Sequence, residues 1–471
     1  MTEKTRFTSV TDADVQAFER IVGPAYVRTD PLSLDKYGRD ETEDLVFPPE
    51  VVVLPASAEE VQAIVRHCYR RRIPITPRAG GTGLSGGALP VFGGVVLSVE
   101  RMNRIVEIDD VNMMAVVEPG VVTADLQRAV EERGLFYPPD PASRFVCCIG
   151  GNVAENAGGP RALKYGTTRD YVYGLDVVLP NGRFLRTGGK LYKDVAGYDL
   201  TRLLVGSEGT LGVFTRIVLR LIPKPAVQWT LFVPFDDWTG AFQALRGIFE
   251  ARLIPAAVEF MDREAVRLTA EHVQRPFPHA DAAALLLIQL DGDDPSVVER
   301  QALRVGEVCE RAGARDVQVA DTPARQEALW AFRRAMGEAV KRASVYKEED
   351  TVVPRDRLPE LLRAVRGLAE RYGFQAVCYG HAGDGNIHVN ILQRGLDETT
   401  WREVLPRAIR ELFEVVVALG GTITGEHGVG WVQRPYLSLA LSAESLRLQR
   451  RLKRLFDPRG IMNPGKVFPD G

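Results

Sequence analysis

Glycine is concentrated in one short segment, residues 77–87, whose sequence PRAGGTGLSGG has five glycines in eleven positions. Such a segment can bring several backbone N–H groups against a phosphate, because no Cβ blocks the approach. It contains a formal GxGxxG, but a Rossmann site requires a helix to open at that point. Gly87, Pro90, Gly93 and Gly94 follow and exclude the helix. The segment therefore indicates either a phosphate-binding loop outside the Rossmann class or a flexible surface loop.

Two further stretches of small residues favour the phosphate. They are IGGNVAENAGG at 149–159 and VGSEGTLGV at 205–213. Three loops of this kind, each flanked by predicted strands, can wrap a long dinucleotide, whereas a single phosphate would not need them. No GxxxxGK[ST] motif is present, so a P-loop NTPase is not expected.

Size and charge set the class of protein. A chain of 471 residues should form two or three domains, and a net charge of −3 gives no overall basic field for nucleic acid or an anionic membrane. The longest apolar run, 282–288, is too short to span a bilayer, and the N-terminus has no signal-peptide pattern. We expect a cytoplasmic protein with no transmembrane segment, and a peripheral position at the membrane stays open. The five cysteines form no CxxC pair, which predicts reduced thiols and no iron–sulfur cluster on this chain.

The pattern of elements changes near Pro223 and Pro225. We predict a first domain at 1–222, a second at 223–425, and a C-terminal segment at 426–471 that folds back towards the first. In the second domain strands alternate with long helices, which predicts a sheet covered on one face by helices. The predicted strands are 229–234, 284–290 and 375–379, and the predicted helices are 239–251, 296–312, 324–342, 356–372 and 400–418.

Three of the six histidines lie in glycine-rich motifs. In YGHAGDGNIHVN, at 379–390, a tight turn at Asp384-Gly385 would let His381 and His388 face each other. His388 and Asn390 are two apart on the predicted strand and point to one face.

The second motif, GGTITGEHGVG at 420–430, places Glu426 beside His427. Two imidazoles and one carboxylate suit a divalent ion that keeps open positions for a substrate. The alternative is a hydrogen-bonded polar turn without metal.

Taken together, the five motifs PRAGGTGLSGG, GGNVAENAGG, VGSEGTLGV, GHAGDGNIHVN and GEHGVG resemble the FAD-linked oxidases of the vanillyl-alcohol oxidase superfamily. The likeness is greatest to the branch of glycolate oxidase catalytic subunits, D-lactate dehydrogenases and D-2-hydroxyglutarate dehydrogenases, and it extends from about 46 to 466. It implies an α+β fold: a two-lobed FAD-binding domain and a cap domain with an antiparallel sheet covered by helices.

The resemblance also implies the site. His381, His388 and Glu426 would bind a divalent metal, usually zinc, and His427 would be the base, with a fourth metal ligand or a loop-stabilising donor as its alternatives. FAD would be non-covalent, because the first loop lacks the histidine to which some relatives attach it. Arg333 would bind the substrate carboxylate, with a helix-surface arginine as the alternative, and Asn390 would face the substrate. The residues implied to contact FAD are Arg78, Gly80, Gly81, Thr82, Gly83, Ser85, Gly151, Asn152, Asn156, Gly158, Gly166, Gly209, Val213 and Asn463.

One departure bears on the substrate. Relatives that take dicarboxylates are expected to carry an extra basic residue just before the position of Asp350, where this chain has Lys347 or Glu348, depending on the register. Glu348 would disfavour a second carboxylate, so we expect oxidation of glycolate or D-lactate to the 2-oxo acid.

The motifs also leave other functions open. A D-2-hydroxyglutarate-type dehydrogenase and a non-catalytic FAD-binding subunit of a larger complex are the main alternatives. An alkyl-dihydroxyacetonephosphate synthase and a zinc hydrolase fit the motifs less well. The electron acceptor is open: oxygen, a quinone, a cytochrome, or an iron–sulfur or second flavin subunit.

Overall fold

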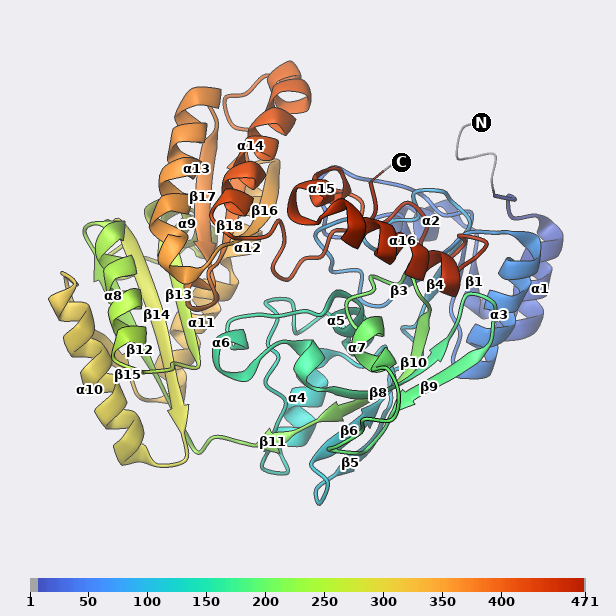
Figure 1. Cartoon of the computed structure of the whole chain (residues 1–471), viewed down its shortest axis with the longest axis horizontal. Helices are drawn as coiled ribbons and strands as arrows, with labels where there is room; N and C mark the ends of the chain where they lie inside the picture. The colour runs from blue at the N-terminus through green and yellow to red at the C-terminus, as the bar shows by residue number, and fades with distance from the viewer. Residues whose placement is uncertain (1–6, 470–471) are drawn as a thin grey trace. The chain divides into compact units, whose positions relative to one another are not determined.

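The chain passes back and forth between two units in the computed structural model, which describes residues 7–469 (Figure 1). Unit 1 contains the chain up to Ala157, Thr167–Lys224, and the chain from Glu426 onwards. Unit 2 contains Gly158–Gly166 and Pro225–Gly425. Among residues 7–469, no helix has the length and apolar character needed to cross a membrane.

The first lobe of unit 1 is a four-stranded sheet with helices packed on it. Strands β2, β4 and β3 run parallel, and β1 pairs antiparallel with β2. Helix α3 begins after Ser57, whose side chain accepts a hydrogen bond from the N–H of Glu60 at 3.2 Å, so the pair of Ser57 and Glu60 in the sequence marks this helix start. The elements are α1 (Asp12–Val22), β1 (Val27–Arg28), α2 (Pro31–Tyr37), β2 (Val51–Val53), α3 (Ala58–Arg71), β3 (Ile75–Arg78) and β4 (Val95–Ser98).

The second lobe of unit 1 is an antiparallel sheet of order β5-β6-β10-β8-β9. Strands β8 and β9 form a hairpin, with Gly182 at φ +77° in its turn. A short pair, β7 and β11, lies apart from this sheet. The elements are β5 (Ile105–Asp109), β6 (Met114–Val117), α4 (Thr123–Glu131), β7 (Leu135–Phe136), α5 (Ile149–Glu155), β8 (Val172–Val178), β9 (Phe184–Gly188), α7 (Leu200–Leu204), β10 (Val213–Arg220) and β11 (Ile222–Pro223).

The prediction of a loop over 149–159 is wrong for its first half, which is helix α5. The glycines there permit close packing: a Cβ on Gly150 would lie 2.6 Å from the Cβ of Pro119. Asn156 ends the helix in the left-handed region at φ 55°. Glycine in this stretch therefore allows close packing of a helix, as well as exposing backbone N–H groups.

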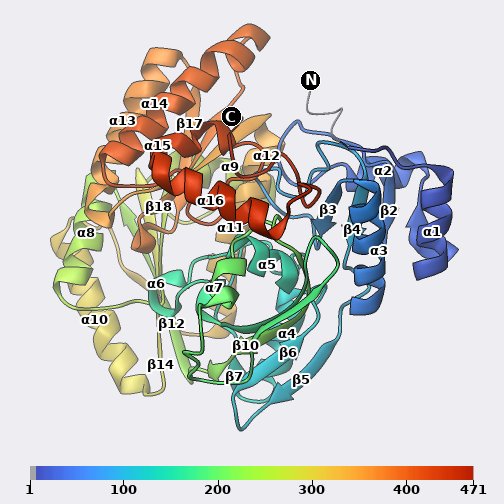
Figure 2. The same cartoon turned by 45° about the vertical axis from the view of Figure 1, so that its right-hand side comes forward.

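The C-terminal segment of unit 1 packs on the first lobe. Met462 bridges in parallel to Ile75 of β3, and the Nζ of Lys453 donates to the carbonyls of Thr210 and Met462, each at 2.7 Å. The helices of this segment are α15 (Leu437–Ala440) and α16 (Ala443–Phe456). Figures 1 and 2 both show α16 crossing one side of unit 1, drawn in red.

Unit 2 is built on one seven-stranded antiparallel sheet of order β15-β12-β14-β13-β17-β18-β16. The sequence predicts four of these strands, the three given by range and the one that carries His388 and Asn390, and β13, β15 and β16 are additional. The strands are β12 (Val227–Phe235), β13 (Ala257–Asp262), β14 (Ala284–Gly292), β15 (Gln318–Ala320), β16 (Tyr346–Val352), β17 (Gln375–Gly380) and β18 (Asn386–Leu392).

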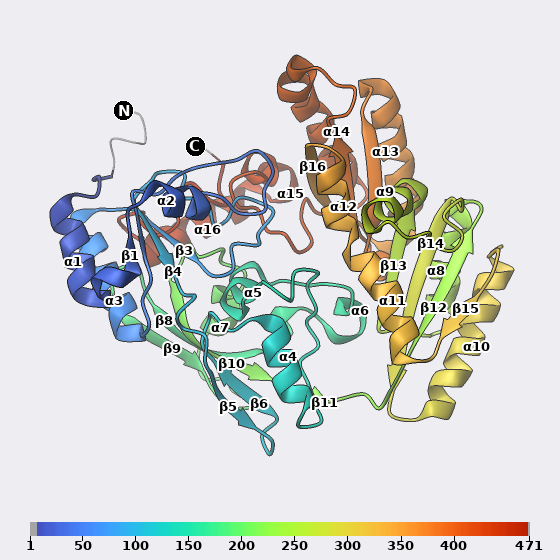
Figure 3. The same cartoon turned by 180° about the vertical axis from the view of Figure 1, so that it is seen from behind.

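Helices cover both faces of this sheet, so the prediction of one covered face is wrong. Phe260 of β13 stacks on Phe242 of α8 with the ring centroids 5.1 Å apart, while its neighbour Met261 packs in the cluster with Val266 and Met336 on the opposite face. One face carries α8 (Trp238–Glu250), α10 (Pro295–Arg311), α13 (Leu358–Tyr372) and α14 (Leu405–Ala418), and the other carries α9 (Arg263–Val273), α11 (Pro323–Arg334) and α12 (Met336–Ala343). Figure 3 shows α11 and α12 in front of the sheet.

Two predicted helices of unit 2 are divided. The helix predicted over 324–342 changes direction at Ala335, whose ψ of −10° ends α11 and begins α12. Phe332 and Arg333 of α11 and Met336 of α12 are all buried on the two sides of this break. The helix predicted over 400–418 starts as a π-helical turn, Thr400–Val404, before α14.

Candidate active site

The hairpin formed by β17 and β18 carries the first histidine motif, within unit 2. A short 3₁₀ turn, Ala382–Asp384, follows β17, and Gly385 takes φ +78° where a Cβ would lie 2.0 Å from the carbonyl oxygen of Val353. The rings of His381 and His388 lie with centroids 5.3 Å apart and planes at 88°. The bend therefore makes the two histidines face each other, as the turn at Asp384-Gly385 predicts.

The carboxylate of Glu259, on β13, lies between a histidine and an arginine. One oxygen, Oε1, is 2.7 Å from Nδ1 of His381, and the other, Oε2, is 2.7 Å from Nη2 of Arg333. Burial by itself would raise the pKa of Glu259, but the adjacent His381 and Arg333 keep that pKa below its usual value. Because Nδ1 of His381 faces Glu259, its Nε2 lies on the opposite side of the ring, and a carboxylate behind one ring nitrogen is typical of a metal-binding histidine.

Arg333, on α11, is buried, and its guanidinium lies over the ring of Tyr379 at 4.9 Å from the centroid. Its Nε has no hydrogen-bond partner within residues 7–469, although the atom is buried. Arg334 points elsewhere and pairs with Glu327, whose side chain is 63% exposed. Neighbouring arginines on one helix thus have different environments.

The pairing of β16 with β18 decides which residue precedes Asp350 on the histidine side. Glu348 lies opposite Asn390, and Asp350 lies opposite His388. Nδ1 of His388 is 3.6 Å from Oε1 of Glu348 and 3.5 Å from Oδ1 of Asp350. Lys347 lies on the other side of the strand with its Nζ over the ring of Trp401. The carboxylate of Glu348, and not the amine of Lys347, therefore faces the site.

Asn390 contributes an unpaired acceptor. Its Nδ2 donates to the carbonyl of Val377 at 3.3 Å, whereas its buried Oδ1 has no hydrogen-bond partner in the described part of the chain. Burial and the nearby Glu348 raise the pKa of Tyr379, on the adjoining strand, so its phenol stays protonated.

Sequence reasoning missed Glu259 and Asp350 as members of this polar cluster, and it left open whether Lys347 or Glu348 faces it. Strand alternation along 346–352 could have paired Glu348 with Asp350, since residues two apart share a face. Nothing local to Glu259 indicates its partners, because Arg333 and His381 are far from it in the sequence.

Asp350 also anchors the segment that leads to the second histidine motif. Its Oδ2 accepts hydrogen bonds from Oγ1 of Thr424 at 2.9 Å and from the N–H of Gly425 at 2.7 Å, and its Oδ1 accepts from Asn386 at 2.7 Å. Gly425 is the last residue of unit 2, and Glu426 follows directly as the first residue of the C-terminal part of unit 1.

Within unit 1, the backbone around His427 has specific hydrogen bonds. The hydroxyl of Ser85 donates to the carbonyl of His427 at 2.9 Å, and the Glu208 carboxylate accepts from the N–H groups of Val429 and Gly430 at 2.9 and 2.6 Å. Nε2 of His427 lies 3.9 Å from a carboxylate oxygen of Glu426.

Gly428 permits a close approach at this turn. It has φ +80°, and a Cβ there would lie 2.3 Å from a carboxylate oxygen of Glu155. Burial and the neighbouring Glu208 raise the pKa of Glu155 well above its usual value. Two buried carboxyl groups therefore enclose the turn that follows His427.

The three stretches of small residues converge in unit 1. A Cβ on Gly80 would lie 3.2 Å from the Cα of Cys147, one on Gly151 would lie 3.6 Å from the Cβ of Ala79, and one on Gly209 would lie 3.6 Å from Nδ2 of Asn463. A Cβ on Gly83 would meet nothing within 4 Å. Close backbone packing below an open glycine loop fits the approach of a dinucleotide phosphate.

Several residues expected at the FAD use their polar groups within the protein. Ser85 bonds to His427, Asn152 donates to Oγ1 of Thr123 at 2.7 Å, and Asn463 donates to the carbonyls of Gly87 and Glu208. These side chains support the loop, so a contact with FAD must use other atoms.

The other residues implied at the FAD are distributed over both units. Arg78 donates to the Arg39 carbonyl, and Asn156 accepts from the N–H of Arg169. Gly81 and Thr82 lie in the first loop, Val213 begins β10, and Gly158 and Gly166 belong to unit 2.

The donor atoms in unit 2 fit a divalent cation. A ring nitrogen of His381 and one of His388 lie within 4.8 Å of each other, and carboxylates stand beside both rings. Imidazole nitrogen with carboxylate oxygen is a donor set that suits zinc and similar ions.

Two protein-family models match most of the chain. The family described as "FAD linked oxidases, C-terminal domain" matches residues 224–467, and the "FAD binding domain" family matches residues 49–188.

Individual proteins are similar to this chain over about nine tenths of its length. The glycolate oxidase subunit GlcD of Bacillus subtilis is 45% identical over 92% of this chain and 92% of its own, and the D-lactate dehydrogenase of Anaerostipes hadrus is 38% identical over 89% of each. Among solved structures, p-cresol methylhydroxylase with bound substrate superposes with a TM-score of 0.81 at 20% identity, over 100% of this chain and 98% of its own. That likeness concerns the fold, and it confirms the α+β prediction of an FAD-binding domain with a cap domain.

Proposed function

Because the chain belongs to the FAD-linked oxidase family, we propose that it oxidises a small D-2-hydroxy acid, glycolate or D-lactate, to the 2-oxo acid. The chain is an FAD-dependent hydroxy-acid oxidoreductase. The substrate, the catalytic residues and the metal are the parts that the proposal adds.

One observation carries the proposal: the buried polar cluster of unit 2 contains a donor and an acceptor that no other part of the described chain satisfies. The donor is Nε of Arg333 and the acceptor is Oδ1 of Asn390, both buried and without a hydrogen-bond partner among residues 7–469. Buried polar groups are rarely left without a partner, and a bound ligand is one way to supply it. A 2-hydroxy acid offers a carboxylate for the guanidinium and a hydroxyl for the amide oxygen.

The size of the acid follows from Glu348. Its carboxylate faces the side of β16 that carries His388 and Asn390 across the strand pair. A second carboxylate on the substrate would meet this like charge, which supports glycolate or D-lactate over D-2-hydroxyglutarate. The basic residue that a dicarboxylate would need is not at this position, since Lys347 lies on the opposite side.

We assign a divalent ion, with zinc as the expected metal, to His381, His388 and Glu426. The hydrogen bond between His381 and Glu259 supports this, because it turns the other ring nitrogen, Nε2, away from Glu259 and leaves it as a possible ligand atom. The bonds of Asp350 to Thr424 and Gly425 support Glu426, because they bring the chain to within one residue of it. Such an ion would lower the pKa of the substrate hydroxyl.

In the reaction, Arg333 binds the carboxylate and Asn390 orients the hydroxyl. His427 accepts the hydroxyl proton at a ring nitrogen, since its usual pKa lies near neutrality. Non-covalent FAD, when bound, would supply the acceptor for the hydride of C2; with the proton taken by His427, the alcohol becomes the carbonyl. Ser85 and Glu208 fix the backbone from the carbonyl of His427 to Gly430 and so help to hold its ring in place.

The electrons then leave to a separate acceptor. The five cysteines are buried and form no disulfide in the described chain. An iron–sulfur or second flavin subunit is a suitable acceptor, and the similar protein named as a glycolate oxidase subunit supports such an assembly.

A turnover screen tests the proposal. Glycolate, D-lactate, L-lactate and D-2-hydroxyglutarate would each be supplied to the purified protein with an artificial dye acceptor. We expect reduction of the dye with glycolate or D-lactate and much slower reduction with the other two acids. Preferential use of D-2-hydroxyglutarate would contradict the role given to Glu348, and reduction with none of the acids would contradict the substrate class.

A further inference from the structure

Helix α16 exposes a row of leucines. Leu448, Leu452 and Leu455 are 48%, 36% and 76% exposed, and their spacing of four and three residues aligns them on one stripe. None of the residues of α16 is fully buried. The helix therefore covers unit 1 while its outward side keeps an apolar strip.

A row of arginines lies next to this strip. Arg447, Arg451 and Arg454 have the same spacing one position earlier, and all three are exposed. Arg447 pairs with Glu444, whereas no ion pair is described for Arg451 or Arg454. The outward side of α16 thus combines three leucines with two uncompensated positive charges.

The positive charge continues from α16 onto α3. Arg459, just after α16, lies over the ring of Tyr69 at 4.4 Å and donates to the carbonyls of Tyr69 and Arg70. The end of α3 adds Arg70 and Arg72, both exposed. We define the basic face as the outward sides of α16 and of the last turns of α3.

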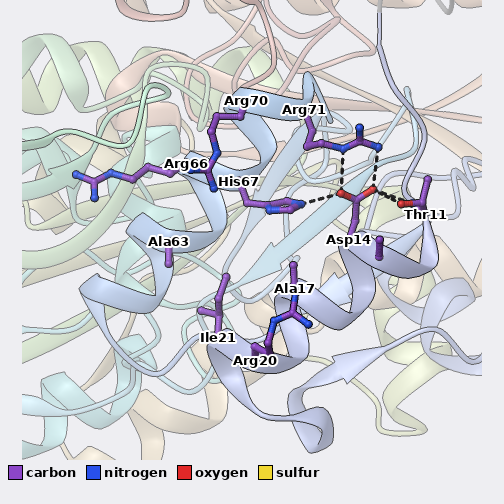
Figure 4. Close-up of a pocket in the computed structure, with 11 residues that line it drawn as sticks. Thr11, Asp14, Ala17, Arg20, Ile21, Ala63, Arg66, His67, Arg70 and Arg71 are labelled. Carbon is purple, nitrogen blue, oxygen red and sulfur yellow. Dashed lines mark hydrogen bonds and ion pairs between the residues drawn. The ribbon is translucent and has the colours of Figure 1, made fainter.

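A groove between α1 and α3 extends the basic face. Figure 4 shows His67 and Arg71 turned onto the carboxylate of Asp14, which accepts from both, whereas Arg66 extends away from it. The Asp14 carboxylate is therefore paired with His67 and Arg71. Arg20 also lines the groove and is exposed, and Asp14 does not compensate its charge.

We propose that the basic face is a docking surface for an anionic lipid membrane, with the leucines of α16 inserted at the level of the head groups. Charge complementarity favours an anionic membrane as the partner of this face. The whole chain has a net charge of −3, but the basic face is locally positive, so that face would turn towards a negative surface. A helix that lies in the membrane plane has this pattern of leucines flanked by arginines. The net charge alone predicts no attraction to such a membrane, because it averages over both units.

Co-sedimentation with vesicles tests the docking surface. The full-length protein with its FAD would be mixed with vesicles of phosphatidylcholine and phosphatidylglycerol, and separately with phosphatidylcholine alone. We expect binding only to the anionic vesicles, and weaker binding as salt is added. Changing Arg451→Glu and Arg454→Glu together should lower the affinity by about 25-fold or more, about fivefold for each positive charge removed from the surface. Changing Leu448→Ser, Leu452→Ser and Leu455→Ser together should also weaken binding.

A matched control lies on α10 of unit 2, where Leu303 is 63% exposed and Arg300 is also exposed. Leu303→Ser with Arg300→Glu should leave vesicle binding at the wild-type level. Flavin content and the thermal midpoint should stay unchanged in all variants, which separates docking from folding. Equal binding to neutral vesicles, or no binding to the anionic ones, would overturn the proposal. So would a stoichiometric complex with a protein partner that the α16 changes abolish while vesicles do not bind.

Discussion

The carboxylate of Glu259 and the guanidinium of Arg333 form an ion pair of 2.7 Å in the interior of unit 2, with side chains 0% and 7% exposed. One residue further along α11, Arg334 makes an exposed pair with Glu327. The chain therefore contains a buried and an exposed version of the same interaction on adjacent residues, which makes each the control for the other.

Arg333→Lys should lower kcat/KM for the 2-hydroxy acid by about 10- to 100-fold, because lysine cannot reproduce the fork of donors that serves Glu259 and the substrate carboxylate together. Steady-state kinetics with a dye acceptor measures this loss. Arg334→Lys is the control and should stay near the wild-type value. Equal losses in the two variants would show that Arg333 has no special contact with the substrate.

Glu259→Gln should destabilise the protein by about 3–5 kcal/mol, because it leaves the Arg333 cation buried without its counter-charge. Glu327→Gln removes the exposed counterpart and should cost less than about 1 kcal/mol. Equilibrium urea unfolding compares the free energies. If both changes cost the same, burial does not distinguish the two pairs.

His388→Ala should remove the divalent ion, since it deletes one of two imidazole donors that lie within 4.8 Å of each other. Elemental analysis should find about one ion per wild-type chain and none in the variant. His272→Ala, in α9 and outside the cluster, should keep the ion. Treatment of the wild type with a chelator should abolish turnover while FAD remains bound, and full activity without metal would exclude a catalytic ion.

His427→Asn should slow flavin reduction by about a hundredfold or more, the usual effect of losing a general base. Rapid mixing of substrate with the oxidised enzyme measures this step directly. FAD and metal should both remain, because the Ser85 bond is to the backbone carbonyl of residue 427 and not to its side chain. Loss of the metal would instead identify His427 as a ligand.

Asp262 should make folding stability fall as the pH rises from about 4 to about 6. Burial raises the pKa of this carboxyl, the N-cap of α9, to about 6. Its unfolded pKa is about 3.9, so the folded state binds more protons in this window and stability is lost with rising pH, by up to about 3 kcal/mol. Asp262→Asn cannot ionise but still accepts the N–H of Ala265, so its stability should change less between these pH values, as urea unfolding would report.

Asp237, the N-cap of α8, is the control with the opposite sign. The hydrogen bonds from Thr239 lower its pKa, so its contribution is present above its unfolded pKa and is lost as the pH falls. Asp237→Asn should therefore leave the decline between about pH 4 and 6 in place. A variant of Asp262 that keeps the full decline would show that another group is responsible.

The sequence by itself determined the features that depend on neighbours along the chain. The Ser57 cap of α3, the bend that turns His381 towards His388, and the different directions of Arg333 and Arg334 all follow from local spacing or turn chemistry. Such features need no knowledge of distant segments, because helix period, strand period and glycine turns are properties of a few consecutive residues.

The tertiary structure alone decided the partners that come from distant segments. Glu259 joins Arg333 and His381 only because β13, α11 and β17 pack together, and Glu348 faces His388 only because of the register between β16 and β18. A shift of one residue in that register would turn Lys347 towards the site instead. The helix over 149–155 and the second covered face of the sheet have the same origin, since burial against distant residues, such as Gly150 on Pro119, outweighed what the local sequence favoured.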